Sequence, residues 1–161
     1  MDSTDRKRAA AELRAEAYRC HLRGDLKSAV ELYTRSIAAL PTAEAFTFRG
    51  WAYQGLGRLD DAIAECKRAI EVDPDFGNPY NDIGAYLMEK GAFDEAIPWL
   101  ERAKSAPRYE PRHFPFMNLG RLYAAKGMFK RAIEELEQAL AIEPRESQTR
   151  EMLANLRAML N

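Results

Sequence analysis

One short signal, a glycine followed five residues later by an alanine, recurs four times and constrains the fold of this chain more than any other feature. The four glycine–alanine pairs are Gly24 with Ala29, Gly57 with Ala62, Gly91 with Ala96, and Gly127 with Ala132. Successive glycines are separated by 33, 34 and 36 residues. A nearly fixed period of this length is typical of chains that stack one supersecondary unit on the next.

Two further positions hold small residues in every unit. They lie seven residues before and twelve residues after each glycine, at Ala17, Gly50, Gly84, Gly120, and at Ser36, Ala69, Ala103, Ala139. Small residues let two helices cross with their backbones close together. Glycine ends a first helix without steric cost, and proline ends the second helix at Pro41, Pro74 and Pro144. The pattern therefore predicts four helix–turn–helix units.

These spacings resemble the tetratricopeptide repeat, whose unit is about 34 residues long. The resemblance covers residues 10 to about 144 and implies an all-α fold, a right-handed α-solenoid of about nine helices. We expect one domain over residues 1–161, with repeats at about 10–42, 43–76, 77–112 and 113–144. An apolar stripe at helical spacing predicts a capping helix at about 145–160, through Met152, Leu153, Leu156 and Leu160.

Several helix ends can be predicted from local signals. We expect Ser3 or Thr4 to cap the first helix and Thr42 to cap the third. The fifth helix is expected to begin at Phe76 and the seventh at Arg112.

The composition excludes several classes of protein. Apolar residues make up 47% of the 161 residues and charged residues 30%, as in a globular chain. The net charge of −1 gives no pull toward nucleic acid or an anionic membrane. The polar segment 1–14 lacks the apolar core of a secretory signal, and no apolar run is long enough to span a bilayer. Two cysteines without metal-ligand spacing favour a reducing, cytoplasmic setting.

The inventory of reactive side chains argues against an enzyme. The two histidines, His21 and His113, fall in different repeats. The two cysteines, Cys20 and Cys66, fall on core positions, where a free cysteine acts as a small apolar residue. No glycine-rich phosphate loop follows a strand, because no strands are expected. We therefore predict no catalytic residues, no metal site and no cofactor.

The resemblance implies that the first helices line a concave groove that receives an extended or helical peptide. Amides on this surface can bond a peptide backbone, aromatic side chains offer rigid contact area, and arginines can meet a carboxylate. Phe48, Phe114 and Met117 also fall on groove positions, but packing between first helices explains them equally well. The predicted partner-binding residues are Arg14, Tyr18, His21, Trp51, Gln54, Asn78, Asn81, Asp82, Met88, Asn118 and Arg121.

One known mode of peptide binding is not expected. Some tetratricopeptide domains hold the C-terminal carboxylate of heat-shock chaperones in a clamp of lysine, asparagine and arginine side chains. The corresponding positions here hold Arg14, Tyr18, Phe48, Asn78 and Asp82. They do not match, and the Asp82 carboxylate would repel a second carboxylate. We therefore expect a protein or peptide partner that is not a chaperone held by a carboxylate clamp.

The link between the third and fourth units is longer than the others. This loop, residues 105–113, is either an insertion of the kind that surface loops tolerate, which we favour, or a lip that contacts a partner. The side chains that would make that contact are Arg108, Tyr109, Arg112 and His113.

A second functional hypothesis is a self-assembling scaffold. It would use the apolar C-terminal helix or the convex face, with the chain as a monomer or weak homo-oligomer.

Overall fold

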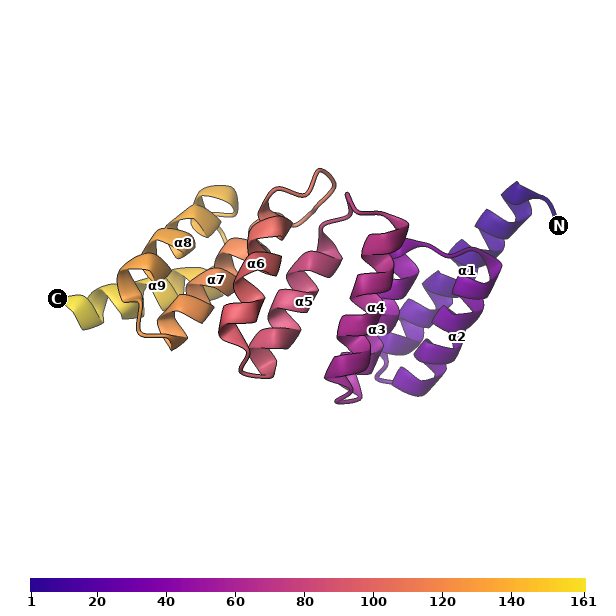
Figure 1. The fold of residues 1–161 in the computed structure, drawn as a ribbon, viewed down its shortest axis with the longest axis horizontal. Helices are drawn as coiled ribbons and strands as arrows, with labels where there is room; N and C mark the ends of the chain where they lie inside the picture. Colours follow the sequence, from indigo (N-terminus) through magenta and orange to yellow (C-terminus); the bar gives the residue numbers. More distant parts are fainter.

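The computed structural model describes residues 1–161 and contains nine α-helices. The helices stack in chain order along the long axis of the molecule, with the two termini at opposite ends (Figure 1). None of them combines the length and apolar composition needed to cross a membrane. The helices are α1 (Ser3–Leu22), α2 (Leu26–Ala39), α3 (Ala43–Gly55), α4 (Leu59–Val72), α5 (Asn78–Glu89), α6 (Phe93–Lys104), α7 (Phe114–Ala125), α8 (Phe129–Ile142) and α9 (Ser147–Leu160).

The helices pack as antiparallel pairs, α1 with α2, α3 with α4, α5 with α6 and α7 with α8. The first helices of successive pairs also contact one another, from α1 to α3, α3 to α5 and α5 to α7. They form an inner layer that is continuous along the stack. Helix α9 packs against α8 as α3 packs against α2, so it stands where the first helix of a further unit would begin. The predicted all-α solenoid is confirmed.

The four signal glycines lie in the turns between paired helices. Their φ angles are 81° at Gly24, 76° at Gly57, 77° at Gly91 and 74° at Gly127. This left-handed region favours glycine because a Cβ atom would clash with the backbone. The local requirement explains why the residue recurs at each turn.

The core follows the small positions of the repeat. The largest cluster of buried side chains runs from α4 to α9 and includes Ile83, Leu100, Leu119 and Leu136. The alanines that follow the turn glycines are fully buried where the paired helices cross. Both cysteines are buried free thiols, as their core positions predicted.

Some helix ends differ from the sequence predictions. Helix α1 is capped by Asp2, whose carboxylate accepts from the Asp5 amide at 2.8 Å, rather than by Ser3 or Thr4. Thr42 caps α3 as predicted, and its hydroxyl accepts from the Ala45 amide at 3.1 Å. Helix α5 begins two residues after Phe76, and α7 two residues after Arg112.

The later start of α5 has a structural cause. The Gly77 amide donates to the Arg108 carbonyl at 2.9 Å, and the Arg108 amide donates to the Asp75 carbonyl at 3.0 Å. These two bonds form an isolated parallel β-bridge between Phe76 and Arg108, and they hold residues 75–77 against the 105–113 loop. The loop is therefore fastened to the link that precedes α5.

Candidate functional site

Three neighbouring cavities lie between the inner helices, and together we call them the inner groove. The first, of about 420 Å³, lies between α7 and α9 and is lined by Met117, Arg121, Gln148, Thr149, Glu151, Met152, Asn155 and Leu156. The second, of about 370 Å³, is lined by Trp51, Asn78, Asn81, Asp82, Tyr109, Pro111, Phe114, Met117, Asn118 and Arg121. The third, of about 290 Å³, is lined by Ala85, Met88, Glu89, Phe93, Asn118, Arg121 and Ala125.

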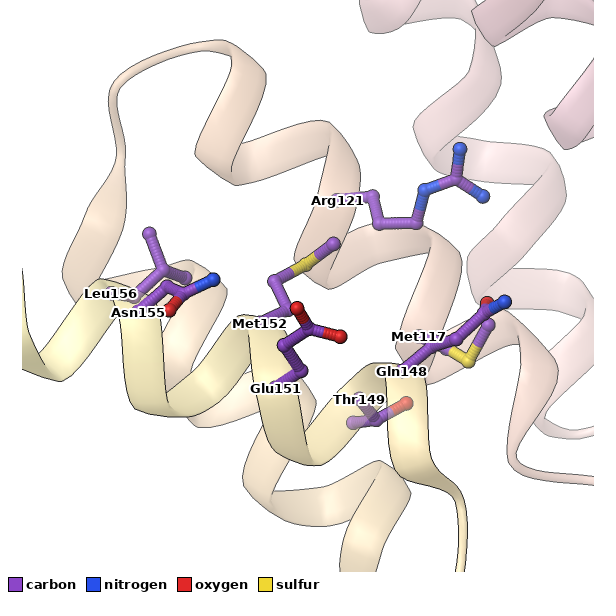
Figure 2. Close-up of a pocket in the computed structure, with 8 residues that line it drawn as sticks. All are labelled: Met117, Arg121, Gln148, Thr149, Glu151, Met152, Asn155 and Leu156. Atoms are coloured by element: carbon purple, nitrogen blue, oxygen red, sulfur yellow. The ribbon is translucent and has the colours of Figure 1, made fainter.

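Arg121 on α7 lines all three cavities. Its side chain is exposed and takes part in none of the ion pairs or side-chain hydrogen bonds of the chain. Figure 2 shows Arg121 and Met117 on α7 across the first cavity from Gln148, Glu151 and Met152 on α9. A free guanidinium at the junction of three cavities is available to an acidic or carbonyl group of a ligand.

Two asparagines connect the third and fourth units within the second cavity. The Asn118 side-chain amide on α7 donates to the Asn81 side-chain oxygen on α5 at 3.0 Å. Both residues are buried, with exposed fractions of 9% and 7%. The pair fixes the register of α5 against α7, and it uses one donor of Asn118 and one acceptor site of Asn81.

Asp82 faces the same cavity from α5. The Trp51 indole N–H donates to its carboxylate at 2.6 Å, which connects α3 to α5. Burial raises the pKa of Asp82 to about 7, although hydrogen bonding from Trp51 and Asn81 acts in the opposite direction. This carboxylate is therefore poorly solvated, and it has no basic side chain in ion-pair contact.

Four of the predicted partner-binding residues lie outside the three cavities. Arg14 donates to the Thr42 hydroxyl at 3.3 Å, and Gln54 donates to Glu89 at 3.1 Å. Tyr18 is 42% exposed, with its ring 6.1 Å from that of Phe48. Burial lowers the pKa of His21, whose Nδ1 has no hydrogen-bond partner. The other seven, from Trp51 to Arg121, line the inner groove.

Phe48, Phe114 and Met117 fall on groove positions but could serve only to pack the first helices together, and the structure separates the three. Phe48 packs against the buried cluster of Ala17 and Tyr33. Met117 is buried but lines two of the cavities. Phe114 is 37% exposed and lines the second cavity. Only Phe48 is committed to packing away from the cavities.

The 105–113 loop makes several internal contacts. Tyr109 and His113 are buried, with 3% and 9% of their surface exposed. Arg112 donates to the carbonyls of Lys104 and Ala106, at 3.0 Å each, at the C-terminal end of α6. Of the four predicted contact residues only Arg108 is exposed, and it pairs with Glu44 and with Asp73. A partner would therefore meet Arg108 before the other three.

Helix α9 supplies groove residues that the sequence analysis did not select. Gln148, Glu151, Met152 and Asn155 line the first cavity, whereas Leu153 and Leu156 are buried. The spacing of three, one and three residues places the four side chains on one helical face beside the packing stripe. The same counting applied to the first helices would have identified them, had α9 been treated as the first helix of a fifth unit.

The reactive groups of the chain are scattered. No three His, Cys, Asp or Glu side chains are grouped as they would be in a metal site. Burial raises the pKa of the Cys66 thiol well above its usual value, so the thiol is held in its unreactive neutral form.

Family comparison identifies two of the units directly. A model of the tetratricopeptide repeat matches residues 43–76, and a second such model matches residues 114–146. The chain is a tetratricopeptide repeat protein. Both matched segments coincide with helix pairs of the solenoid, α3 with α4 and α7 with α8.

Curated relatives of this tetratricopeptide repeat protein match it over part of their own length. Protein SGT1 homolog of Oryza sativa subsp. japonica is 31% identical over 137 residues, which is 84% of this chain and 33% of the relative. Small glutamine-rich tetratricopeptide repeat-containing protein 2 of Mycosarcoma maydis is 33% identical over 89 residues, 55% of this chain and 25% of the relative. This chain thus spans a third or less of these proteins.

Solved structures agree on the fold. The Pseudomonas aeruginosa pilF structure has a TM-score of 0.88 at 22% identity, covering 94% of this chain and 69% of that one. The structure of PilW, described as a type IV pilus biogenesis factor, has a TM-score of 0.84 at 22% identity, with coverage of 93% and 69%. At this level of identity the similarity shows a shared solenoid.

Proposed function

We propose that this chain is a non-catalytic module that binds a peptide or protein segment of a partner in its inner groove. Its tetratricopeptide repeats support a role in protein–protein interaction. The observation that carries the proposal is the free Arg121 side chain at the junction of three cavities.

The chemistry of the groove supports a peptide as the ligand. Met117 and Met152 give the first cavity adaptable apolar walls. Amide side chains line both the first and the second cavity: Gln148 and Asn155 line the first, and Asn78 lines the second. Amides can both donate to and accept from a peptide backbone. Apolar walls with a few polar groups are typical of ligand sites on proteins.

The proposed partner is a protein, and we do not expect nucleic acid, a membrane or a cofactor. A net charge of −1 gives no general attraction to polyanions. Two buried free thiols are in keeping with a reducing, cytoplasmic setting. One relative over 45% of this chain is named Heat shock protein STI1. The clamp positions nevertheless hold Tyr18, Phe48 and Asp82, so we propose a different mode of binding.

A charge reversal at Arg121 tests the groove. Affinity capture from the native host would compare the wild type, Arg121→Glu and Arg35→Glu. Arg35 is the matched control because it is also exposed and unpaired but lies on α2, away from the three cavities. We expect partners to be lost with Arg121→Glu and kept with Arg35→Glu. An identical partner list for all three proteins would overturn the proposal.

A second candidate function is self-assembly through the C-terminal end. Met159 and Leu160 on α9 are 66% and 55% exposed, and Met128 before α8 is 40% exposed. Leu160 lines a shallow hollow of about 620 Å³ together with Met128 and Phe129. Sedimentation velocity over a range of concentrations, with a Met159→Ser, Leu160→Ser variant for comparison, tests this function. A wild type that stays monomeric at all concentrations would exclude it.

A further inference from the structure

The second cavity contains an acidic group without a cationic partner. The Asp82 carboxylate accepts from the Trp51 indole at 2.6 Å, and none of the ion pairs of the chain includes it. Each of four other partly or fully buried carboxylates pairs with a lysine or arginine, namely Glu44, Glu65, Asp73 and Glu135. Glu65, for example, is buried and held by two arginines, Arg49 and Arg68. Asp82 thus differs from these carboxylates, because it is poorly solvated and has no counter-charge.

Aromatic side chains line the cavity that contains this carboxylate. Trp51, Tyr109 and Phe114 all line the same cavity, from α3, the 105–113 loop and α7. A cation near an aromatic face gains energy from the ring quadrupole, most strongly at tryptophan. A carboxylate beside aromatic walls therefore favours a positively charged group with an apolar stem.

The charges around the cavity point to the same ligand. Burial raises the pKa of Asp82, and the charge of Asp82 contributes to the raised pKa values of Tyr86, Tyr109 and Cys66. An incoming cation would offset the desolvation of the carboxylate. Arg121 is the only basic side chain that lines the cavity, and it forms no contact with Asp82.

We propose that the second cavity holds a lysine or arginine side chain of the partner segment, with its cationic group on Asp82 and its stem across Trp51 and Phe114. This inference rests on the proposed groove function and specifies the chemistry of the partner. A bound metal ion fits less well, because no other carboxylate, histidine or thiol is grouped with Asp82. A cavity of about 370 Å³ has room for a long side chain.

A random peptide library tests the inference without knowledge of the natural partner. Phage-displayed 12-residue peptides would be selected on the immobilised full chain, as wild type, Asp82→Asn and Glu71→Gln. Asparagine keeps the shape of Asp82 and an oxygen for the Trp51 N–H, so the fold is retained, which thermal unfolding checks. Glu71→Gln is the matched control, because Glu71 is an exposed acidic residue on α4 that forms no ion pair and lines none of the three cavities.

We expect the wild type and Glu71→Gln to select peptides with a lysine or arginine at one constant position, and Asp82→Asn to lose that preference. A selected peptide would then be synthesised with the basic residue replaced by norleucine or citrulline. On the wild type, the neutral peptide should bind at least about tenfold more weakly than the basic peptide. On Asp82→Asn, the two peptides should differ in affinity by less than about threefold. In a Trp99→Phe background, the fluorescence of Trp51 reports the binding directly.

The outcomes separate this inference from the groove function. Peptides that lose binding to Arg121→Glu but carry no constant basic residue would overturn the inference and support the groove. Basic peptides that Asp82→Asn selects equally well would also overturn it. If no peptide is enriched over the bare support, both proposals fail.

Discussion

The Asn118 side-chain amide donates a hydrogen bond of 3.0 Å to the Asn81 side-chain oxygen, and this bond joins the first helices of the third and fourth units inside the groove. Both residues are buried. A buried amide that loses its partner keeps its desolvation cost. The pair therefore contributes to stability and holds the groove in shape.

Replacing Asn118 with alanine should destabilise the fold by about 1–2 kcal/mol, because the Asn81 oxygen would lose its donor. Urea unfolding followed by circular dichroism measures this change. Asn155→Ala, at an exposed position on α9 without a side-chain hydrogen bond, should change stability by less than about 0.5 kcal/mol. The double variant with Asn81→Ala should be less destabilised than the sum of the two single variants. Additive effects would show that the bond contributes nothing.

Local requirements explain why so much of the fold was predictable. A turn glycine at positive φ and a small residue at a helix crossing depend on only a few neighbouring residues. Such requirements place the same kind of residue at the same position in each unit. The repeat period and the nine helices could therefore be predicted from the sequence. The Thr42 cap was predictable for the same reason.

The groove was only partly predictable because it depends on contacts between units. Trp51 and Asp82 lie 31 residues apart in sequence, and Arg108 and Glu44 lie 64 apart. No local pattern marks such a pair, since the rotation of one unit against the next decides which side chains meet. Counting repeat positions found the residues of α3, α5 and α7 but also selected Arg14 and Gln54, which bond to neighbouring elements instead.

The buried carboxylate of Glu65 supports a second stability prediction. Glu65 is 1% exposed, and the Arg49 guanidinium donates to its two oxygens at 2.5 and 3.0 Å. Removing one partner of a buried ion pair leaves the other charge uncompensated. Glu65→Ala should therefore lower the free energy of unfolding by about 2–4 kcal/mol, as measured in urea.

The exposed pair of Lys90 with Asp60 is the control for this measurement. Asp60 has 84% of its side-chain surface exposed, and such surface pairs contribute less than about 1 kcal/mol. Asp60→Ala should therefore cost less than about 1 kcal/mol. A loss for Glu65→Ala as small as that for Asp60→Ala would contradict the structural role of Glu65.

The small position before each turn supports a third prediction. A Cβ atom on Gly84 would lie 2.5 Å from both Cγ and Cδ2 of Leu100, whereas one on Gly50 would lie 3.3 Å from its nearest neighbour, the Ala62 carbonyl. Gly84→Ala should destabilise the fold by about 1–3 kcal/mol through overpacking. In Gly50→Ala, a gain of about 0.5–1 kcal/mol in helix propensity should offset most of the contact cost. Thermal unfolding compares the two variants, and equal midpoints would refute the distinction.

Asp82 supports a prediction about pH. Its pKa rises from 3.8 to about 7 on folding because burial disfavours the charged carboxylate. Between about pH 4 and 7 the folded chain therefore holds a proton that the unfolded chain has released. Stability should fall as the pH rises through this window, and the full penalty should be present above pH 7. A shift of this size corresponds to about 4 kcal/mol, and we expect about 2 kcal/mol because Asp82 retains some access to water.

Asp82→Asn removes this titration, so a comparison with the wild type separates the effect of Asp82 from that of every other titratable group. The variant and the wild type should have similar stability near pH 4, where both side chains are neutral and both accept from Trp51. At pH 8 the variant should be more stable by about 2 kcal/mol, since it has no carboxylate to desolvate. Urea unfolding at intervals from pH 4 to 8 measures the difference. A gap between the two proteins that stays constant with pH would mean that Asp82 titrates normally, so that the carboxylate is well solvated in the folded chain.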